Sequence, residues 1–365
     1  MKVDVAIAGG GPAGLGVAIE AARRGLSAVV IERMTGVVDK ACGEGLMPAG
    51  VARLAALGVD PPGIPFRGIR YVDGDVVAQA DFVEGPGRGV RRLALGAALQ
   101  ARVASLGVER WETTEVTGFR EDSDGVDVET SSGRVRARWL VAADGLHSQI
   151  RKQAGFTVTS GPRRRLGIRR HFATAPWSEH VEVWWADGVE AYVTPVAVDQ
   201  VGVAFLWSGG RGDYATFLQR FPALSARLGE PSSAIRGSGP FDVRVAGQVR
   251  GRVLLAGDAA GYVDALTGEG ISLALEGAEA MVDCLLAGTP EAWSGRWQAV
   301  TRRHRFLTRL LLGIAARPWV RRRLTRALSR TPAGFQAFLA MNSGAWTPLR
   351  ALPGAGSVGY RLLTG

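Results

Sequence analysis

Residues 2–32 read KVDVAIAGGGPAGLGVAIEAARRGLSAVVIE. The pattern predicts a strand over Lys2–Ala8, a glycine turn (GGGPAG), a helix over Leu15–Arg24 and a strand over Ser27–Ile31 that ends at Glu32. This order is typical of a dinucleotide-binding unit. The glycines let the backbone approach a pyrophosphate, the helix N-terminus offers unpaired N–H groups, and the acid accepts hydrogen bonds from a ribose. The alternative is a glycine-rich turn that joins a strand to a helix without a ligand.

Composition places the chain among ordinary globular proteins. Its 365 residues allow two domains, and 47% hydrophobic with 21% charged residues is a normal balance for a soluble protein. We see no signal peptide, and no apolar run reaches the roughly 18 residues that a membrane span needs. The two cysteines, Cys42 and Cys284, form no disulfide framework, and no Cys/His group has metal-ligand spacing. We therefore expect no metal site and a location in the reducing cytoplasm, with peripheral contact to a membrane as an open addition.

The net charge is +10, and much of the excess arginine lies late in the chain. The late arginines are Arg302, Arg303, Arg305, Arg309, Arg317, Arg321, Arg322, Arg323, Arg326 and Arg330. Three interpretations stay open: a solvated helical face, docking onto an anionic partner such as an acidic carrier protein or a phosphorylated substrate, and contact with an anionic membrane surface. The third is considered because Phe306 and Leu310–Leu312 share the segment. No motif accompanies the charge that would indicate nucleic-acid binding.

The middle of the chain predicts a helix, a meander and a second sheet. Residues 90–106 have helical spacing, and three short runs over 115–120, 125–130 and 135–140 predict an antiparallel meander that leads into ADGLHS (143–148). Four β-rich runs follow, over 166–173, 180–185, 190–195 and 200–207, and predict an antiparallel sheet. This part is rich in aromatic residues: Phe172, Trp177, Trp184, Trp185, Tyr192, Phe205 and Trp207. They form either the core of the sheet or a wall over a hydrophobic substrate, and both hold if side chains alternate between faces.

The dinucleotide-binding pattern resumes late in the chain. Residues 253–256 predict a buried strand, followed by GDAAG (257–261), a loop, TGEGI (267–271) and a helix to about residue 286. The remainder predicts helices broken by Pro318, Pro332 and Pro348. We therefore expect a discontinuous nucleotide-binding domain over 1–70, 90–165 and 245–290. A substrate domain over 71–89 and 166–244 is inserted in it, and a helical region spans 291–365.

Four segments in this order resemble one flavoprotein family. They are GGGPAG with Glu32, Arg92 at the start of a helix, ADGLHS with Arg151, and LLAGDAAG with TGEGI. They are similar to the family that includes the para-hydroxybenzoate-hydroxylase-type monooxygenases and the geranylgeranyl reductases, over residues 1–290. The resemblance implies FAD as the cofactor. It also implies an α/β fold: a Rossmann-like, glutathione-reductase-type domain with an inserted antiparallel β-sheet domain and C-terminal helices.

The resemblance also assigns the residues that contact FAD. They are Gly9, Gly11, Ala13, Gly14, Glu32, Arg33, Cys42, Gly43, Arg92, Val116, Asp144, Asp258, Gly268, Gly270 and Ile271. Glu32 would bind the adenosine ribose, Asp258 the ribityl chain, and the helix that begins near Gly270 would stabilise the anionic reduced flavin. Asp144 would bridge FAD and a transient NAD(P)H donor, or cap the helix that follows it.

One segment points to the reductases within this family. Residues 40–46, KACGEGL, resemble the K-x-C-G-x-G-L segment of geranylgeranyl reductases, whereas AYVTP (191–195) matches their Y-x-W-x-F-P signature only in part. Cys42 has two interpretations: a functional thiol at the flavin ring, which a lowered pKa would favour, or a small side chain that lets a loop pack on FAD. The other candidate catalytic residues are Tyr192, Thr194 and Arg169, and His171 follows Arg169 on the same strand face.

These residues lead to three functional hypotheses. The first is an FAD-dependent monooxygenase, a hydroxylase or epoxidase that acts through a flavin C4a-hydroperoxide on an apolar or aromatic, carrier-bound or free, small molecule. The second is a flavin-dependent double-bond reductase that resembles geranylgeranyl reductase. The third is a non-redox flavoprotein, a cyclase or isomerase. NAD(P)H would serve as a transient electron donor, since no second nucleotide-binding glycine motif is visible.

Overall fold

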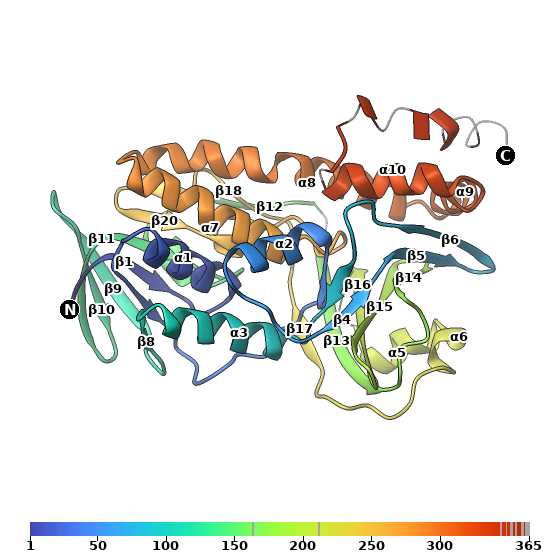
Figure 1. The fold of residues 1–365 in the computed structure, drawn as a ribbon, viewed down its shortest axis with the longest axis horizontal. Helices are drawn as coiled ribbons and strands as arrows, with labels where there is room; N and C mark the ends of the chain where they lie inside the picture. The colour runs from blue at the N-terminus through green and yellow to red at the C-terminus, as the bar shows by residue number, and fades with distance from the viewer. Residues whose placement is uncertain are drawn as a thin grey trace.

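The computed structural model in Figure 1 describes residues 1–361 except 163, 211, 344, 348, 351, 352, 355, 359 and 360. Its first sheet has the strand order β19-β20-β11-β1-β2-β8. The bounds are β1 (Lys2–Ala8), β2 (Ala28–Ile31), β8 (Glu109–Trp111), β11 (Gly133–Ala142), β19 (Val249–Arg250) and β20 (Val253–Leu255). β1 lies between β2 and β11, both parallel to it, and β20 continues the parallel arrangement beside β11. The late strand therefore joins the N-terminal unit, as the resumed pattern predicts.

The predicted meander extends this sheet. β9 (Val116–Glu121) and β10 (Val126–Thr130) pair antiparallel, and β10 pairs with β11. The turn between β9 and β10 is closed by Asp122, whose Oδ1 accepts hydrogen bonds from the backbone N–H groups of Asp124 and Gly125. A side chain that satisfies turn N–H groups in this way explains why the Asp-Ser-Asp-Gly sequence forms a tight turn.

Helices cover the parallel sheet. They are α1 (Pro12–Arg23), α2 (Pro48–Ala56), α3 (Arg92–Ser105) and α7 (Gly270–Leu286), with the short α4 (Gln149–Gln153) after β11. α1 packs directly on α7, and a side chain at Gly16 would meet Leu275 at 3.1 Å. Val5, Ile7 and Ile19 are fully buried between sheet and helices. Burial of this apolar surface is the main stabilising term for the unit.

The second sheet has the order β17-β13-β16-β15-β14-β5-β6. Its strands are β5 (Gly68–Asp73), β6 (Val76–Asp81), β13 (Arg165–Ala173), β14 (His180–Ala186), β15 (Val189–Ala197), β16 (Gln200–Ser208) and β17 (Arg236–Ser238). The predicted antiparallel pairing is confirmed for β13 with β16, for β16 with β15 and for β15 with β14. In the same sheet, β14 and β5 run parallel. The helices α5 (Tyr214–Gln219) and α6 (Pro222–Ser225) pack on its outer face.

Smaller elements join the two sheets. β3 (Gly45–Leu46), β4 (Ile64–Phe66) and β7 (Gly87–Gly89) form a three-stranded sheet, and β12 (Val158–Ser160) pairs with β18 (Val243–Val245). Two short 3₁₀ turns complete the described part, η1 (Gly257–Ala260) and η2 (Pro290–Ala292). The residue boundaries of the domains stay a prediction.

After η2 the described residues form α8 (Trp293–Ala315), α9 (Pro318–Arg330) and α10 (Pro332–Ser343). Pro318 and Pro332 are each the first residue of a helix, because proline lacks the N–H that a first turn leaves unpaired and its fixed φ suits that position. Pro348 lies outside the described residues. α8 lies beside α7, while α9 and α10 cover β6 (Figure 1). Across the described residues, none of the helices has the length and apolar character required to cross a bilayer.

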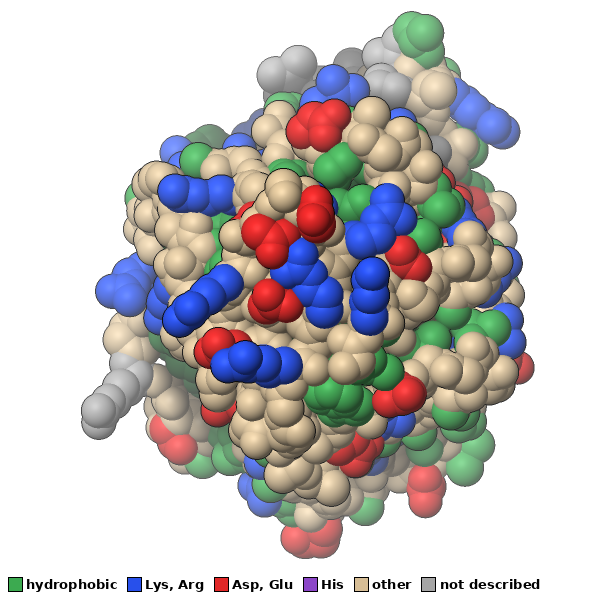
Figure 2. Space-filling model, turned by 90° about the vertical axis from the view of Figure 1, so that its left-hand side faces the viewer, with side chains coloured by type: hydrophobic (Ala, Val, Ile, Leu, Met, Phe, Trp, Pro, Cys, Tyr) green, Lys and Arg blue, Asp and Glu red, His purple; other side chains and the backbone are tan. Residues whose placement is uncertain are grey.

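Charge is mixed on the face at the left of Figure 1. Figure 2 shows basic and acidic side chains side by side on that face. At that end of the molecule Arg136 pairs with Asp122 and Asp127, and Arg138 pairs with Asp4. The net positive charge therefore does not gather on this face.

Candidate functional site

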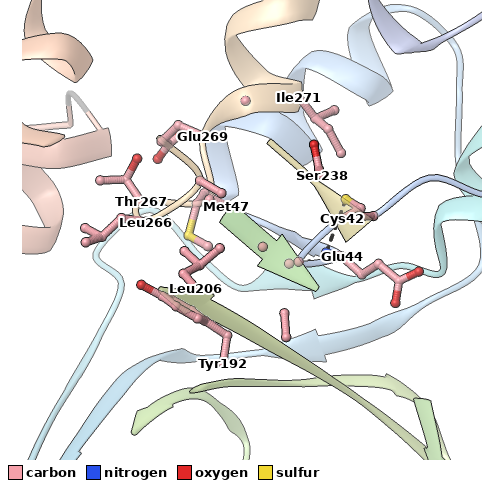
Figure 3. Close-up of a pocket in the computed structure, with 18 of the residues that line it drawn as sticks. Cys42, Glu44, Met47, Tyr192, Leu206, Ser238, Leu266, Thr267, Glu269 and Ile271 are labelled. Atoms are coloured by element: carbon pink, nitrogen blue, oxygen red, sulfur yellow. Dashed lines mark hydrogen bonds between the residues drawn. The ribbon is translucent and has the colours of Figure 1, made fainter. Parts of the chain in front are cut away.

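The motifs singled out from the sequence meet at one cavity of about 300 Å³. Its wall includes the glycine turn before α1, the KACGEGL segment, residues 143, 145 and 146, GDAAG, TGEGI, the second sheet and the C-terminal helices. Figure 3 shows Cys42, Met47, Tyr192 and Glu269 bordering the same space. Segments more than 200 residues apart in the chain are thus brought together by the fold.

Most of the predicted site residues line this cavity. They are Gly11, Ala13, Cys42, Gly43, Arg92, Arg169, Tyr192, Thr194, Asp258, Gly268, Gly270 and Ile271. Six others do not form part of the wall: Gly9, Gly14, Glu32, Arg33, Val116 and Asp144. The roles assigned to these residues toward a ligand stay predictions.

Two glycines of the first turn are required for different reasons. A Cβ on Gly14 would lie 2.0 Å from the carbonyl oxygen of Gly9, so only glycine lets α1 pack against the end of β1. A Cβ on Gly11 would meet no protein atom within 4 Å. Gly11 therefore leaves space on the cavity side, where a pyrophosphate would approach the backbone.

Glu32 lies at the end of β2 and is held by backbone donors. Its Oε2 accepts a hydrogen bond from the N–H of Gly10 at 2.7 Å, and its Oε1 accepts one from Met34 at 2.9 Å. A carboxylate has about four acceptor positions, so lone pairs remain for ribose hydroxyls. Arg33 is exposed beside it, and Val116 begins β9 away from the cavity wall.

Asp144 caps a helix. Its Oδ2 accepts hydrogen bonds from the N–H groups of Gln149 (2.8 Å) and Ile150 (3.3 Å), and Ser148 accepts one from Arg151. The capping interpretation is confirmed. The other oxygen, Oδ1, is buried and has no hydrogen-bond partner among the described residues. Its buried acceptor is available to a ligand that donates a hydrogen bond.

Asp258 borders the cavity from η1, after Gly257 in the left-handed region (φ +55°). Burial raises the pKa of the Asp258 carboxyl, while the positive charges of Lys40 and Arg92 lower it. Its side chain is exposed to the cavity although protein surrounds it. This placement suits a carboxylate that accepts hydrogen bonds from the hydroxyls of a bound ligand.

The KACGEGL segment is fixed by buried charges. Glu44, which has φ +60°, accepts a hydrogen bond from the N–H of Arg92 at 2.7 Å and lies 2.5 Å from His171 Nε2. Arg169 Nη2 donates to Asp39 at 2.7 Å and to the carbonyl of Lys40 at 3.1 Å. Arg169 and His171 therefore bind the protein's own segment, which makes them positioning residues. His171, expected on the pocket face with Arg169, is buried and does not line the cavity.

Cys42 lies on the cavity wall with a protonated thiol. Burial, followed by the negative charge of Glu44, raises its pKa above the ordinary value of 9.0, and Arg92 and Arg169 only partly oppose this. The N–H of Glu44 donates to the sulfur at 3.3 Å. The lowered pKa that would favour a reactive thiolate is not found. A neutral thiol in this place is a proton donor or a packing group.

The face of β15 that carries Tyr192 and Thr194 borders the cavity, as period 2 predicts. Thr194 Oγ1 donates to the carbonyl of Gly43 at 2.8 Å, so it fastens the cysteine loop to the sheet. Tyr192 donates to Glu190 at 3.2 Å, and Glu190 pairs with the buried Arg165. Burial, followed by Glu190, raises the pKa of Tyr192 well above its usual value. Tyr192 thus remains a neutral phenol at the cavity.

Of the two interpretations of the aromatic residues, sheet core applies to most of them and cavity wall to Tyr192. Trp177, Trp184, Phe172, Phe205 and Trp207 pack together on the far face of the sheet, under α5 and α6. The cavity face instead carries Val181, Val183, Ala204 and Leu206, with Tyr192 the one member of the cluster in the described wall. The alternation of side chains in a strand separates the two groups.

Sequence reasoning missed Glu269, which stands between the two predicted glycines of TGEGI. Its side chain lies in the wall beside Thr267 and Leu266 (Figure 3) and is 7% exposed. Burial raises its pKa from 4.5 to about 7, and Oε1 has no partner among the described residues. The sequence feature that could have identified Glu269 is a carboxylate between two glycines at the start of a predicted helix.

The C-terminal helices also contribute to the wall, which the sequence does not indicate. Leu311 of α8 and Phe338, Leu339 and Asn342 of α10 line the cavity. Asn342 Oδ1 is a further buried acceptor without a hydrogen-bond partner in the described part of the chain. Packing of α10 on β6 and against α8 brings Phe338, Leu339 and Asn342 to the site.

The residues present fit a bound FAD. The open space beside Gly11 suits a phosphate, the unpaired Asp144 Oδ1 and the enclosed Asp258 suit ligand hydroxyls, and α7 begins at the wall with Gly270. A helix N-terminus carries partial positive charge, which stabilises a ligand that becomes anionic on reduction. The cavity wall therefore provides for a phosphate at Gly11 and for ligand hydroxyls at Asp258, while Glu32 and Asp144 lie outside this wall.

Comparison with known proteins agrees with this geometry. The chain matches the FAD binding domain family over residues 2–64 and 88–204. It is 28% identical over 331 residues to menaquinone reductase of Mycolicibacterium smegmatis, covering 83% of this chain and 81% of that protein. It is 29% identical over 326 residues to para-nitrophenol 4-monooxygenase of Pseudomonas sp., covering 78% of this chain and 77% of that protein. The solved structure of a Diels-Alderase from the biosynthetic pathway of pyrroindomycins has the same fold. Its TM-score is 0.76 at 23% identity, over 93% of this chain and 80% of that one.

The fold and the site define an FAD-binding enzyme. The chain belongs to the flavoprotein family that includes the para-hydroxybenzoate-hydroxylase-type monooxygenases and the geranylgeranyl reductases, and it is an FAD-dependent oxidoreductase. The predictions of FAD as cofactor, of the enzyme class and of the α/β fold are confirmed, and NAD(P)H as electron donor stays a prediction.

Proposed function

We propose that this oxidoreductase is a monooxygenase that acts on an apolar or aromatic small molecule and takes its electrons from transiently bound NAD(P)H. One observation carries the proposal: the cavity that borders TGEGI continues to a wall of aliphatic side chains on the second sheet. Ile69, Val181, Val183 and Leu206 form that wall. The similarity to para-nitrophenol 4-monooxygenase supports it.

The protein's contribution is a dry, shaped site, while bound FAD would supply the redox chemistry and the reaction with dioxygen. The aliphatic wall excludes water and orients the substrate. Tyr192, kept neutral by burial, offers a phenol to a polar atom of the substrate. Thr194 fixes the loop of Cys42 through Gly43, which sets the floor of the pocket.

A double-bond reductase is the second candidate. The protonated thiol of Cys42 on the wall is a group that could deliver a proton to a substrate carbon. The similarity to menaquinone reductase over 83% of the chain supports this candidate. In this case Cys42→Ala would remove the proton donor, whereas Cys42→Ser would retain a weaker one.

A substrate-free measurement separates the two. The FAD-loaded protein is reduced without air and mixed with dioxygen, and hydrogen peroxide is followed beside oxygen consumption. A monooxygenase shows a lag before peroxide release, because its dry pocket protects the activated oxygen. Immediate release in step with oxygen consumption favours the reductase.

A second measurement uses para-nitrophenol and menaquinone as probes. With NADPH and isotope-labelled dioxygen, a labelled product shows the monooxygenase, while a product with two added hydrogens formed without air shows the reductase. Conversion of a probe without NADPH and without any change in flavin absorbance would favour the non-redox hypothesis. Tyr192→Phe and Thr194→Val should weaken turnover of a converted probe, and unchanged kinetics would place the pocket elsewhere.

A further inference from the structure

The exposed side of α8 and α9 combines arginines with large apolar side chains. Trp319 is 70% exposed, Phe306 66% and Leu310 47%. We define the basic–apolar face by the exposed residues Arg302, Phe306, Arg309, Leu310, Arg317, Trp319, Arg322, Arg326 and Arg330. Large apolar groups among charges on one face are a mark of an interaction surface.

Helical spacing sets this face. The members of this face on α8 are spaced four, three and one positions apart: Arg302, Phe306, Arg309 and Leu310. This spacing places them on one side of the helix. The opposite side, with Leu307 and Leu312, is buried. α9 begins after two further residues, and its Trp319 is likewise exposed. The two helices contact each other.

The charge of this region is one-sided. No Asp or Glu follows Glu291 in the sequence, whereas the ten late arginines all do. Arg321 forms ion pairs with two carboxylates that precede this region in the chain, Asp73 and Asp187. Arg305 lies among like charges: burial, followed by the positive charges of Arg309 and Arg244, lowers the pKa of its guanidinium. The mixed charges of the face in Figure 2 make the contrast clear.

We propose that the basic–apolar face docks onto an anionic phospholipid bilayer. Arginines gain from the negative surface potential and bind lipid phosphates, and exposed Trp, Phe and Leu side chains enter the boundary between headgroups and acyl chains. Aromatic and arginine side chains also serve protein interfaces, so binding to an acidic protein in place of vesicles is the competing outcome of the test below. The docking does not depend on which reaction the chain catalyses.

The same face lies next to the cavity. Leu311, the neighbour of the exposed Leu310, is part of the cavity wall, as are Phe338 and Asn342 of α10. A molecule taken from the bilayer would therefore need to pass only one layer of helices to reach the site.

Vesicle sedimentation tests the proposal with the full, FAD-loaded chain. The protein should sediment with vesicles of phosphatidylcholine mixed with phosphatidylglycerol and not with phosphatidylcholine alone, and salt should weaken the binding. The double variant Arg302→Gln with Arg309→Gln should lower partitioning by about five-fold per arginine. Phe306→Ser with Trp319→Ser should lower it on the same vesicles without changing the salt dependence.

Matched substitutions elsewhere serve as controls. Arg134→Gln removes an exposed arginine from β11, and Val198→Ser removes an apolar side chain that is 78% exposed, so both should bind as the wild type does. Melting temperature and flavin content report whether each variant folds. Absence of binding to anionic vesicles, or equal binding by the face variants and the controls, would overturn the proposal.

Discussion

Arg321 in α9 forms a buried ion pair with Asp73 in β5. Its Nε lies 2.9 Å from Asp73 Oδ2, and Nη2 lies 3.2 Å from Oδ1. Both side chains are almost fully buried, at 4% and 2% exposure. The pair joins residues 248 positions apart and anchors the C-terminal helices to the second sheet, where they complete the cavity.

Removal of one partner should therefore be costly. Asp73→Asn leaves the Arg321 charge buried with only the exposed Asp187 nearby, and we expect a loss of about 3–5 kcal/mol in the free energy of unfolding. Denaturant titration measures it. Glu129→Gln, which breaks the exposed pair with Arg134, should cost less than about 1 kcal/mol. Equal effects would show that the Asp73 pair is not an anchor.

Gly11 and Gly14 should respond differently to alanine. At Gly11 the backbone (φ −80°) accepts a side chain and no protein atom lies within 4 Å, so Gly11→Ala should leave the melting temperature of the FAD-free protein unchanged. Its Cβ would occupy the place of the pyrophosphate, so we expect FAD affinity to fall at least about ten-fold, or about 1.4 kcal/mol. Gly14→Ala should destabilise the FAD-free protein itself, because of its contact with Gly9.

Gly295→Ala in α8 is a suitable control, since its Cβ also meets no protein atom within 4 Å but lies outside the cavity wall. It should retain FAD affinity. Unchanged FAD affinity in Gly11→Ala would mean that the pyrophosphate does not approach this turn.

Cys42 should be a slow thiol. Because burial and Glu44 raise its pKa, little thiolate exists near neutral pH, and alkylation by iodoacetamide should keep accelerating above pH 9. We expect added FAD to protect the thiol, since Cys42 lines the cavity. The measurement uses a Cys284→Ala background, so that a single thiol is followed by mass spectrometry. An alkylation rate that levels off near pH 7 would contradict the raised pKa.

Glu269 should make stability depend on pH. Its pKa is about 7 in the folded chain and 4.5 when unfolded, so the unfolded state loses its proton first and stability falls as pH rises through this interval. Glu269→Gln removes this dependence. In the FAD-free protein, the free energy of unfolding of Glu269→Gln relative to the wild type should therefore rise by about 3 kcal/mol between pH 4.5 and pH 7.

Unfolding titrations at several pH values test this, with Glu279→Gln as a control on the same helix. A variant whose pH profile parallels that of the wild type would show that Glu269 ionises freely in the folded state. Glu84 and Glu276 raise the pKa and Arg303 lowers it, so salt should reduce the difference only partly.

Much of the fold could be predicted because local patterns agree with the final structure. Lys2–Ala8 is a strand with the predicted bounds, and the runs at 166–173 and 200–207 each became strands within one residue. The glycine turn and GDAAG could be placed because few backbones tolerate their geometry. The residues of the cavity wall could not be predicted as well. Leu206 and Trp207 are adjacent in the sequence and lie on opposite faces of the sheet, and the packing of α5 and α6 decides which of the two faces is core.

The amino-acid sequence by itself determined the glycine turn over residues 9–14, the acid at Glu32 and the order of strands and helices, because these depend on residues close in the chain. Tertiary structure alone decided that Arg169 and His171 hold the protein's own segment, that the thiol of Cys42 stays protonated, and that α10 closes the cavity. The raised pKa of Cys42 arises mainly from burial, and the ion pairs join residues more than 100 positions apart, as between Arg169 and Asp39. No local pattern encodes such distances.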